Sequence, residues 1–156
     1  LAMGAIASGG VRILNETVVT SLRIPPATIE EVTAHEEAEL ARRERQYRDA
    51  RPWPNLHGRT VMLVDDGLAT GATMHAAAIA VRRQEPARLI VAAPVAALET
   101  CNALRAVVDE IVCAITPERF HAVGLWYDDF EQTTDDEVRE LLARAGQAMQ
   151  PGTIVK

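Results

Sequence analysis

Two adjacent carboxylates stand just before a short turn of small residues near the middle of the chain. Asp65 and Asp66 follow an apolar run, and Thr70, Gly71 and Thr73 come soon after them. A helix that starts at such a turn offers unpaired N–H groups and the positive end of its dipole to a phosphate. The carboxylates would repel a phosphate on contact, so they suit sugar hydroxyls or a divalent cation better. The segment therefore predicts a site for a sugar phosphate.

A purely structural interpretation of the acid pair has to be weighed against this one. Adjacent acids after a strand are often only a solvated turn or a helix cap, but the threonines and the glycine that follow at this spacing weaken that interpretation. Other phosphate-binding loops do not fit. No G-x-G-x-x-G follows an apolar run, Gly67 and Gly71 are too close together for a Walker loop, and the one lysine of the chain is Lys156.

The patterns around the turn predict an α/β fold. Thr60–Val64 is a continuous β-branched and apolar run, typical of a strand buried on both faces. Further strands are expected at Leu89–Ala93 and Glu110–Ile115, with helices over Gly71–Gln84 and Leu98–Val108 between them. This alternation predicts a parallel sheet with right-handed crossovers. Ligands bind such sheets beyond the carboxyl ends of the strands, which is where the acid pair falls.

The first fifty residues predict a β-hairpin and a polar helix. Ala2–Ala7 and Val11–Leu14 flank a Ser-Gly-Gly turn. Two capping boxes, in which a hydroxyl and a Glu three residues later satisfy helix-start amides, begin at Thr28 and Thr33. The helix is expected to continue to about Asp49. Its few apolar positions place it on the surface or against a partner.

Length and composition favour one folded unit. The chain has 156 residues, of which 48% are hydrophobic and 24% charged, as is usual for a globular domain. A third capping box, from Thr134 to Glu137, opens a helix near the end. We therefore expect a single domain over residues 1–156, with a hairpin (1–15), a helical arm (28–50), an α/β core (59–116) and a C-terminal segment (117–148).

Charge and residue types argue against several classes of function. A net charge of −6 disfavours a general grip on nucleic acid. The longest apolar run, Leu89–Leu98, is too short to cross a bilayer, and no signal peptide is apparent. Cys101 and Cys113 fit no disulfide or zinc framework, which favours a cytoplasmic, reduced setting. A phosphoacceptor signalling domain would need an interior lysine, so we reject that interpretation.

Residues 61–74, Val-Met-Leu-Val-Asp-Asp-Gly-Leu-Ala-Thr-Gly-Ala-Thr-Met, resemble the motif with which type I phosphoribosyltransferases bind 5-phosphoribosyl 1-pyrophosphate (PRPP). Residues 1–10 and 120–130 resemble segments of a bacterial subfamily of unassigned substrate, so the resemblance covers most of the chain. It implies a Rossmann-like parallel sheet with flanking helices. The family's earlier strand and its pyrophosphate-gripping loop are not apparent upstream of Gly9.

The resemblance implies an enzyme that displaces pyrophosphate from C1 of the ribose with a nitrogen of a nucleobase or related heterocycle. Mg²⁺ is the implied cofactor, bridging the pyrophosphate and the ribose hydroxyls. Asp65 and Asp66 are the implied catalytic residues, holding the 2- and 3-hydroxyls and supporting the cationic ring. Family members that act on 6-oxopurines carry an acid where this chain has Ala69, so hypoxanthine and guanine are disfavoured. The implied 5-phosphate ligands are Gly67, Leu68, Ala69, Thr70, Gly71, Ala72 and Thr73.

Some alternatives stay open at this point. The same fold could serve as a non-catalytic module that binds PRPP or a nucleotide, which the missing strand favours. The polar helix and the short sheet make a homodimer plausible. Trp126 and Tyr127 could stack on a base, although packing at the domain edge is the better-supported interpretation. The acidic turn at 128–131 could hold a cation but is more typical of solvated surface. The arginines between 42 and 51 could reach pyrophosphate, but the acids among them favour a charged helix face.

Overall fold

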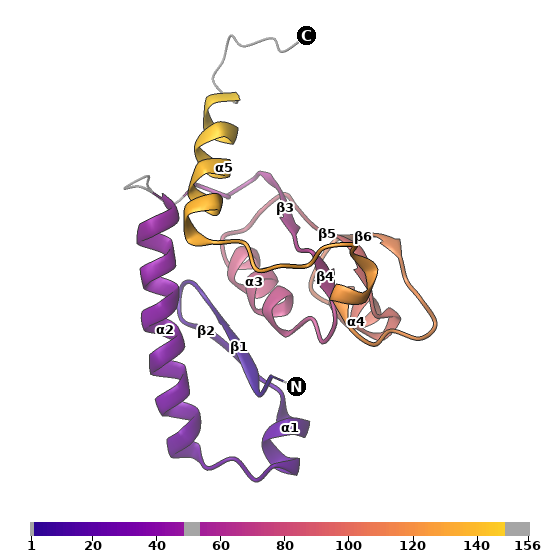
Figure 1. Ribbon diagram of the computed structural model, residues 1–156. Coiled ribbons are helices and arrows are strands. Elements are labelled where there is room, and N and C mark those ends of the chain that lie inside the picture. The colour runs from indigo at the N-terminus through magenta and orange to yellow at the C-terminus, as the bar shows by residue number, and fades with distance from the viewer. Residues whose placement is uncertain (1, 49–53, 149–156) are drawn as a thin grey trace.

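A computed structural model describes residues 2–48 and 54–148 of the chain (Figure 1). Its elements, in chain order, are β1 (Gly4–Ala7), β2 (Val11–Leu14), α1 (Glu16–Ser21), α2 (Pro26–Arg48), β3 (Thr60–Val64), β4 (Gly67–Leu68), α3 (Ala72–Arg82), β5 (Arg88–Ala96), α4 (Leu98–Leu104), β6 (Glu110–Ile115), the 3-10 helix η1 (Val123–Trp126) and α5 (Asp135–Ala148). No helix in these ranges is long and apolar enough to span a membrane.

The main sheet is parallel and has β5 at its centre. β3 and the short β4 pair with one side of β5, and β6 pairs with the other. Val64 lies opposite Ala92 and Gly67 opposite Val95, so the two residues between β3 and β4 form a gap beside the middle of β5. Pro94 lies at this gap. A residue without an N–H is tolerated there, because no β3 residue needs its bond.

The helices of the sheet lie on one face, for a reason set by topology. The chain moves in the same direction across the sheet from β3 to β5 and from β5 to β6, and right-handed crossovers then place both connecting helices on the same side. The core forms there. Leu89 and Val91 of β5 pack with Met74 of α3 and with Cys101 and Leu104 of α4.

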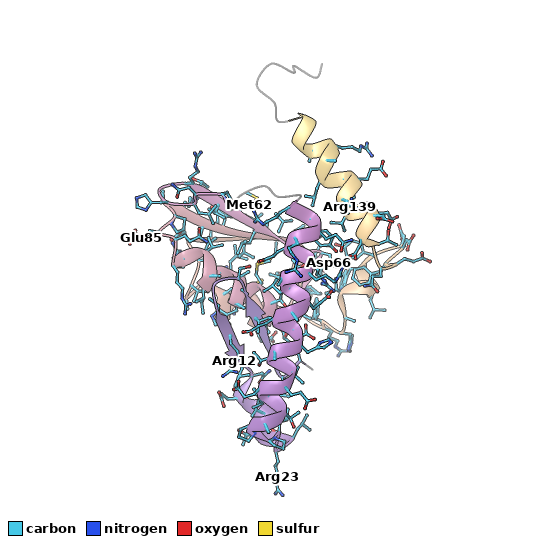
Figure 2. The ribbon with its side chains drawn as sticks, turned by 90° about the vertical axis from the view of Figure 1, so that its left-hand side faces the viewer. Arg12, Arg23, Met62, Asp66, Glu85 and Arg139 are labelled. Carbon is cyan, nitrogen blue, oxygen red and sulfur yellow. The ribbon has the colours of Figure 1, made fainter. Side chains whose placement is uncertain are left out.

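The opposite face of the sheet corrects one expectation. Thr60–Val64 is not buried on both faces, because the side chains of Met62 and Val64 are 58% and 69% exposed. Val61 and Leu63 alternate with them and pack against the core. A run of apolar residues indicated the strand correctly, but it could not tell that both crossovers would fall on one side. Met62 is labelled on this outer strand in Figure 2.

The N-terminal hairpin is confirmed as an antiparallel pair with Gly4 opposite Leu14. It packs on α3, and α2 lies along its other side, so the hairpin is sandwiched between the two helices (Figure 1). Together with the parallel sheet and its helices, this confirms the expected α/β fold class. α1 was not expected. The side chain of Asn15 caps it by accepting a hydrogen bond of 3.2 Å from Val18 N.

The helix ends differ in places from those expected. α2 begins at Pro26, so the capping boxes proposed at Thr28 and Thr33 are wrong, and the Thr33 hydroxyl instead donates to Ile29 O at 2.7 Å. Proline is favoured in the first helical turn, where no N–H is needed, and it outweighed the later cap signals. The expected end at Asp49 lies outside the described residues. α4 is shorter than expected and ends at Leu104.

The capping box before α5 is confirmed. The backbone N–H of Thr134 donates to Glu137 Oε2 at 2.7 Å, and the N–H of Glu137 donates to the Thr134 hydroxyl at 3.3 Å. The same contacts lower the pKa of Glu137. α5 then stands beside the C-terminal end of α2, where Asp135 accepts from Arg42 at 3.0 Å and from the Tyr47 hydroxyl.

Candidate functional site

The predicted site residues form one continuous segment, residues 65–73, which we call the site loop. It leaves the carboxyl end of β3, pairs briefly with β5 as β4, and enters α3. Asp65, Gly67, Gly71 and Ala72 are half-buried, Leu68 is buried, and Asp66, Ala69, Thr70 and Thr73 are exposed.

The two acids occupy different environments. The Asp65 N–H donates to Ala92 O at 3.2 Å, which continues the β3–β5 ladder by one bond. Its carboxylate accepts a 3.0 Å hydrogen bond from the N–H of Asp66. Burial raises the pKa of Asp65, and the Asp66 N–H opposes this only in part. Asp65 therefore carries a partly desolvated charge, which interacts more strongly with a nearby cation than an exposed charge does.

The middle of the loop is packed too tightly to vary. Leu68 is buried in the core, so only its backbone is available to a ligand. A Cβ on Gly67 would lie 2.5 Å from a methyl carbon of Val123, in the 3-10 helix of the C-terminal segment. The C-terminal segment therefore covers one side of the loop, and a residue larger than glycine would push the two apart.

The end of the loop forms an uncapped helix start. Gly71 has φ 68° and ψ 9°, a left-handed conformation that glycine adopts readily, and no side chain caps the helix at this residue. The His75 N–H donates to Gly71 O at 2.8 Å as the first helical bond. The earlier first-turn amides, those of Ala72, Thr73 and Met74, have no partner within the helix. Such amides, with the helix dipole behind them, can bind an anion.

The site loop also reaches the N-terminal part of the molecule. Thr73 lines a cavity of about 500 Å³ whose other walls come from β1, β2 and α2. Arg12 and Arg43 border this cavity, and each is paired with an acid, Arg12 with Glu30 at 2.8 Å and Arg43 with Glu39 at 2.7 Å. Arg12 is labelled beside α2 in Figure 2, and Asp66 lies higher in the same view.

Two residues that contact the loop were missed or understood differently from the sequence. The Thr100 hydroxyl donates to Ala69 O, and no local pattern marks this threonine. The Tyr127 hydroxyl donates to Asp66 O at 2.6 Å, and its ring lies 5.2 Å from that of Phe130. Tyr127 therefore packs at the domain edge, as favoured from the sequence, and it also contacts the acid pair. Trp126 beside it is 42% exposed.

The remaining candidates form surface contacts. Glu39 binds both Arg42 and Arg43, which lowers the pKa of Glu39 to about 2. These contacts fit the charged-face interpretation of the arginine-rich stretch, of which Arg51 lies outside the described residues. In the acidic turn, Asp129 accepts a hydrogen bond of 3.0 Å from Glu131 N. Within residues 2–48 and 54–148 no group of three or more His, Cys, Asp or Glu could hold a metal by itself.

Comparison with known proteins agrees with the geometry. The profile of the family described as "Phosphoribosyl transferase domain" matches residues 4–129. Two proteins of Mycobacterium tuberculosis, "Putative phosphoribosyl transferase Rv0571c" of strain H37Rv and "Putative phosphoribosyl transferase MT0597" of strain CDC 1551, are each 40% identical to this chain over 145 residues. The match covers 93% of this chain and 33% of each relative, so the chain spans about a third of their length.

A solved structure has the same fold. The crystal structure of TT1426 from Thermus thermophilus is 38% identical in sequence, with a TM-score of 0.71. The match covers 92% of this chain and 68% of that one.

Proposed function

Because the chain belongs to the family of phosphoribosyl transferase domains, we propose that it binds PRPP and transfers the phosphoribosyl group to a nucleobase or related nitrogen heterocycle, releasing pyrophosphate. One observation carries the proposal. A half-buried carboxylate, Asp65, and an uncapped helix start behind a left-handed Gly71 are joined by a few residues at the end of one strand. The first suits a sugar and the second a phosphate.

The 5-phosphate of the ligand would bind at the α3 end of the site loop. Amides from Gly67 to Thr73 would donate to its oxygens, with the exposed hydroxyls of Thr70 and Thr73 as further donors. Leu68 would contribute only its backbone, since its side chain is buried. The chain has no lysine in this region, so the helix dipole and the amides would supply the positive potential.

The acids would bind the ribose hydroxyls, which donate well to carboxylates. In the reaction, a nitrogen lone pair forms the bond to C1 as the C1–O bond breaks, and pyrophosphate leaves with that electron pair. The ring is cationic at the transition state. The negative charges of Asp65 and Asp66 stabilise it, Asp65 more strongly because burial leaves its charge poorly screened.

The acid pair also fits the Mg²⁺ that the family resemblance implies. Carboxylate oxygens are the hard donors that Mg²⁺ prefers, and this ion is commonly held by one or two carboxylates together with substrate phosphates. The described residues offer no larger ligand cluster, which agrees with such a shared site. When bound, the ion neutralises charge on the leaving pyrophosphate.

Calorimetry tests the binding half of this proposal. Asp65→Asn with Asp66→Asn removes both charges at constant size, and PRPP binding in the presence of Mg²⁺ should be lost while the fold is kept. Asp128→Asn with Asp129→Asn is the matched control, because it neutralises another adjacent acid pair on the exposed turn. Unchanged affinity in the first double variant would overturn the proposal.

A turnover assay tests the catalytic half. Pyrophosphate release is measured with PRPP, Mg²⁺ and a panel of purine, pyrimidine and other nitrogen heterocycles. Release with any acceptor supports the transferase. Tight binding of PRPP without release for any acceptor would instead identify a binding module with the same site.

A further inference from the structure

The backbone carbonyls of the site loop are tied to the rest of the protein at three points. Asp66 O accepts from the Tyr127 hydroxyl, Leu68 O accepts from Ala97 N at 2.9 Å, and Ala69 O accepts from the Thr100 hydroxyl. Two of these three donors belong to the start of α4, at its N-cap and in its first turn. The loop is therefore held to α4 through its carbonyl oxygens.

This arrangement determines where the loop's amides point. A peptide unit is planar and trans, so its C=O and the N–H of the following residue point in opposite directions. A carbonyl of Leu68 or Ala69 that points toward α4 turns the next N–H away from α4. Those amides belong to Ala69 and Thr70, which are both exposed. The helix behind the loop thus orients donors on its outer side.

Thr100 contacts the loop with both branches of its side chain. Its hydroxyl donates to Ala69 O, and its methyl carbon lies 2.4 Å from where a Cβ on Gly71 would be. The residue is 8% exposed, the one polar residue among the buried residues of the described ranges. A buried hydroxyl is costly without a partner, so its bond to the loop is strongly favoured.

We propose that Thr100 is a positioning residue of the phosphate site, which holds the Ala69–Thr70 peptide so that the Thr70 amide faces the 5-phosphate. It does this without touching the ligand. The inference rests on the proposed function and adds a specific role for a residue on α4, some thirty positions along the chain from the loop.

Two variants separate the two branches of the side chain. Thr100→Val keeps the shape and removes the hydroxyl, whereas Thr100→Ser keeps the hydroxyl and removes the methyl. We expect Thr100→Val to weaken the binding of ribose 5-phosphate roughly three- to tenfold, the range for one lost hydrogen bond, and Thr100→Ser to bind within about twofold of wild type. Thr134→Val is the matched control, because it removes a threonine hydroxyl from the α5 cap.

A spectroscopic signature separates positioning from general stability. In wild type, the ¹⁵N–¹H signal of Thr70 should move downfield on addition of ribose 5-phosphate, as expected for an amide that donates to a phosphate. In Thr100→Val this shift should shrink or vanish, while thermal unfolding confirms that the variant is folded. Should that variant not fold, Thr100→Ala compared with Thr100→Ser isolates the hydroxyl in the same way.

The outcomes distinguish this inference from the proposed function. If wild type binds ribose 5-phosphate and Thr100→Val binds it equally well with the same Thr70 shift, the inference is wrong and the proposed function stands. Equal weakening in the Ser and Val variants would assign the effect to methyl packing and overturn the hydrogen-bond role. If wild type binds neither ribose 5-phosphate nor PRPP, the proposed function fails, and this inference with it.

Discussion

The α/β unit, from β3 to β6, and the arm, from β1 to α2, are held together by different forces. In the α/β unit, β5 is lined by fully buried side chains such as Leu89, Val91 and Val95. The arm has few buried residues, namely Val11, Val18 and Ile29. Along α2 the side chains form ion pairs that are largely exposed, among them those of Glu39 with its two arginines.

This difference explains where the site is built. Apolar packing over a closed core fixes backbone positions closely, and the site loop begins and ends in strands and a helix of that core. Exposed ion pairs contribute little to stability, and they are weakened further by salt. We therefore expect matched substitutions to have large effects in the α/β unit and small ones in the arm.

The largest contrast should come from the core. Leu89→Ala removes a fully buried side chain, and we expect it to lower the free energy of unfolding by about 2–5 kcal/mol. Val32→Ala on α2 removes a side chain that is 38% exposed and should cost less than about 1 kcal/mol. Urea unfolding of both variants measures the difference. Equal losses would mean that the arm is packed as firmly as the core.

Two glycines with positive φ give the next contrast. Gly71 has φ 68° and Gly9, in the hairpin turn, has φ 80°. A Cβ on Gly71 would meet the Thr100 methyl at 2.4 Å, whereas one on Gly9 would meet nothing within 4 Å. Both alanine variants incur backbone strain, but Gly71→Ala should cost about 1–3 kcal/mol more because of this crowding.

Ligand binding separates the same two variants a second time. Gly71→Ala should also lose PRPP affinity in calorimetry, because the helix start that it distorts is the proposed phosphate site. Gly9→Ala should keep that affinity. A Gly71→Ala protein that binds as wild type does would show that this turn is not where the phosphate lies.

Two tyrosine hydroxyls allow a finer comparison. Tyr127 donates to the backbone of Asp66, whereas Tyr47 on α2 donates to Asp135 at the start of α5. Tyr127→Phe should weaken PRPP binding roughly two- to tenfold, because the acid pair loses one of its supports. Tyr47→Phe removes the same atom and should leave affinity unchanged. Calorimetry that finds equal affinities in the two variants would remove Tyr127 from the support of the site.

Much of this fold and site could be predicted from sequence because the signals are local. The strand, acid pair, turn and helix of the site loop follow one another within fourteen residues, and the Ser-Gly-Gly turn and the α5 capping box are equally local. Apolar runs marked all the long strands of the sheet. In each case neighbouring residues alone decide the conformation, so their types and spacing suffice.

What sequence reasoning missed depends on contacts between distant segments. Thr100 meets Ala69 only after α4 has packed on the sheet, and nothing near Thr100 marks it. The open face at Met62 follows from the side on which two crossovers fall, which one strand cannot encode. Likewise, the pattern gave Asp65 and Asp66 equal roles, whereas the structure buries only the first in part.

The two regions should finally respond to pH with opposite signs. Burial raises the pKa of Asp65, so its ionised form costs folding free energy at neutral pH, and that cost disappears as pH falls below its folded-state pKa. Hydrogen bonds from Arg42 and Arg43 lower the pKa of Glu39 from 4.5 to about 2, so its stabilising effect is present above the ordinary value and is lost as pH falls from there.

Thermal unfolding across a pH series tests these signs with two isosteric variants. At neutral pH, Asp65→Asn should raise Tm, because it removes a poorly solvated charge, and Glu39→Gln should lower Tm slightly, because it removes the partner of two exposed arginines. Both differences should shrink toward acid pH, as each wild-type carboxyl becomes protonated in the folded protein. The Asp65 difference should shrink at the higher pH, since its pKa is the raised one. If Asp65→Asn instead lowers Tm at neutral pH, the Asp65 carboxylate is already stabilised by a partner in the free protein, and the contrast between a partly desolvated site acid and a paired surface acid is lost.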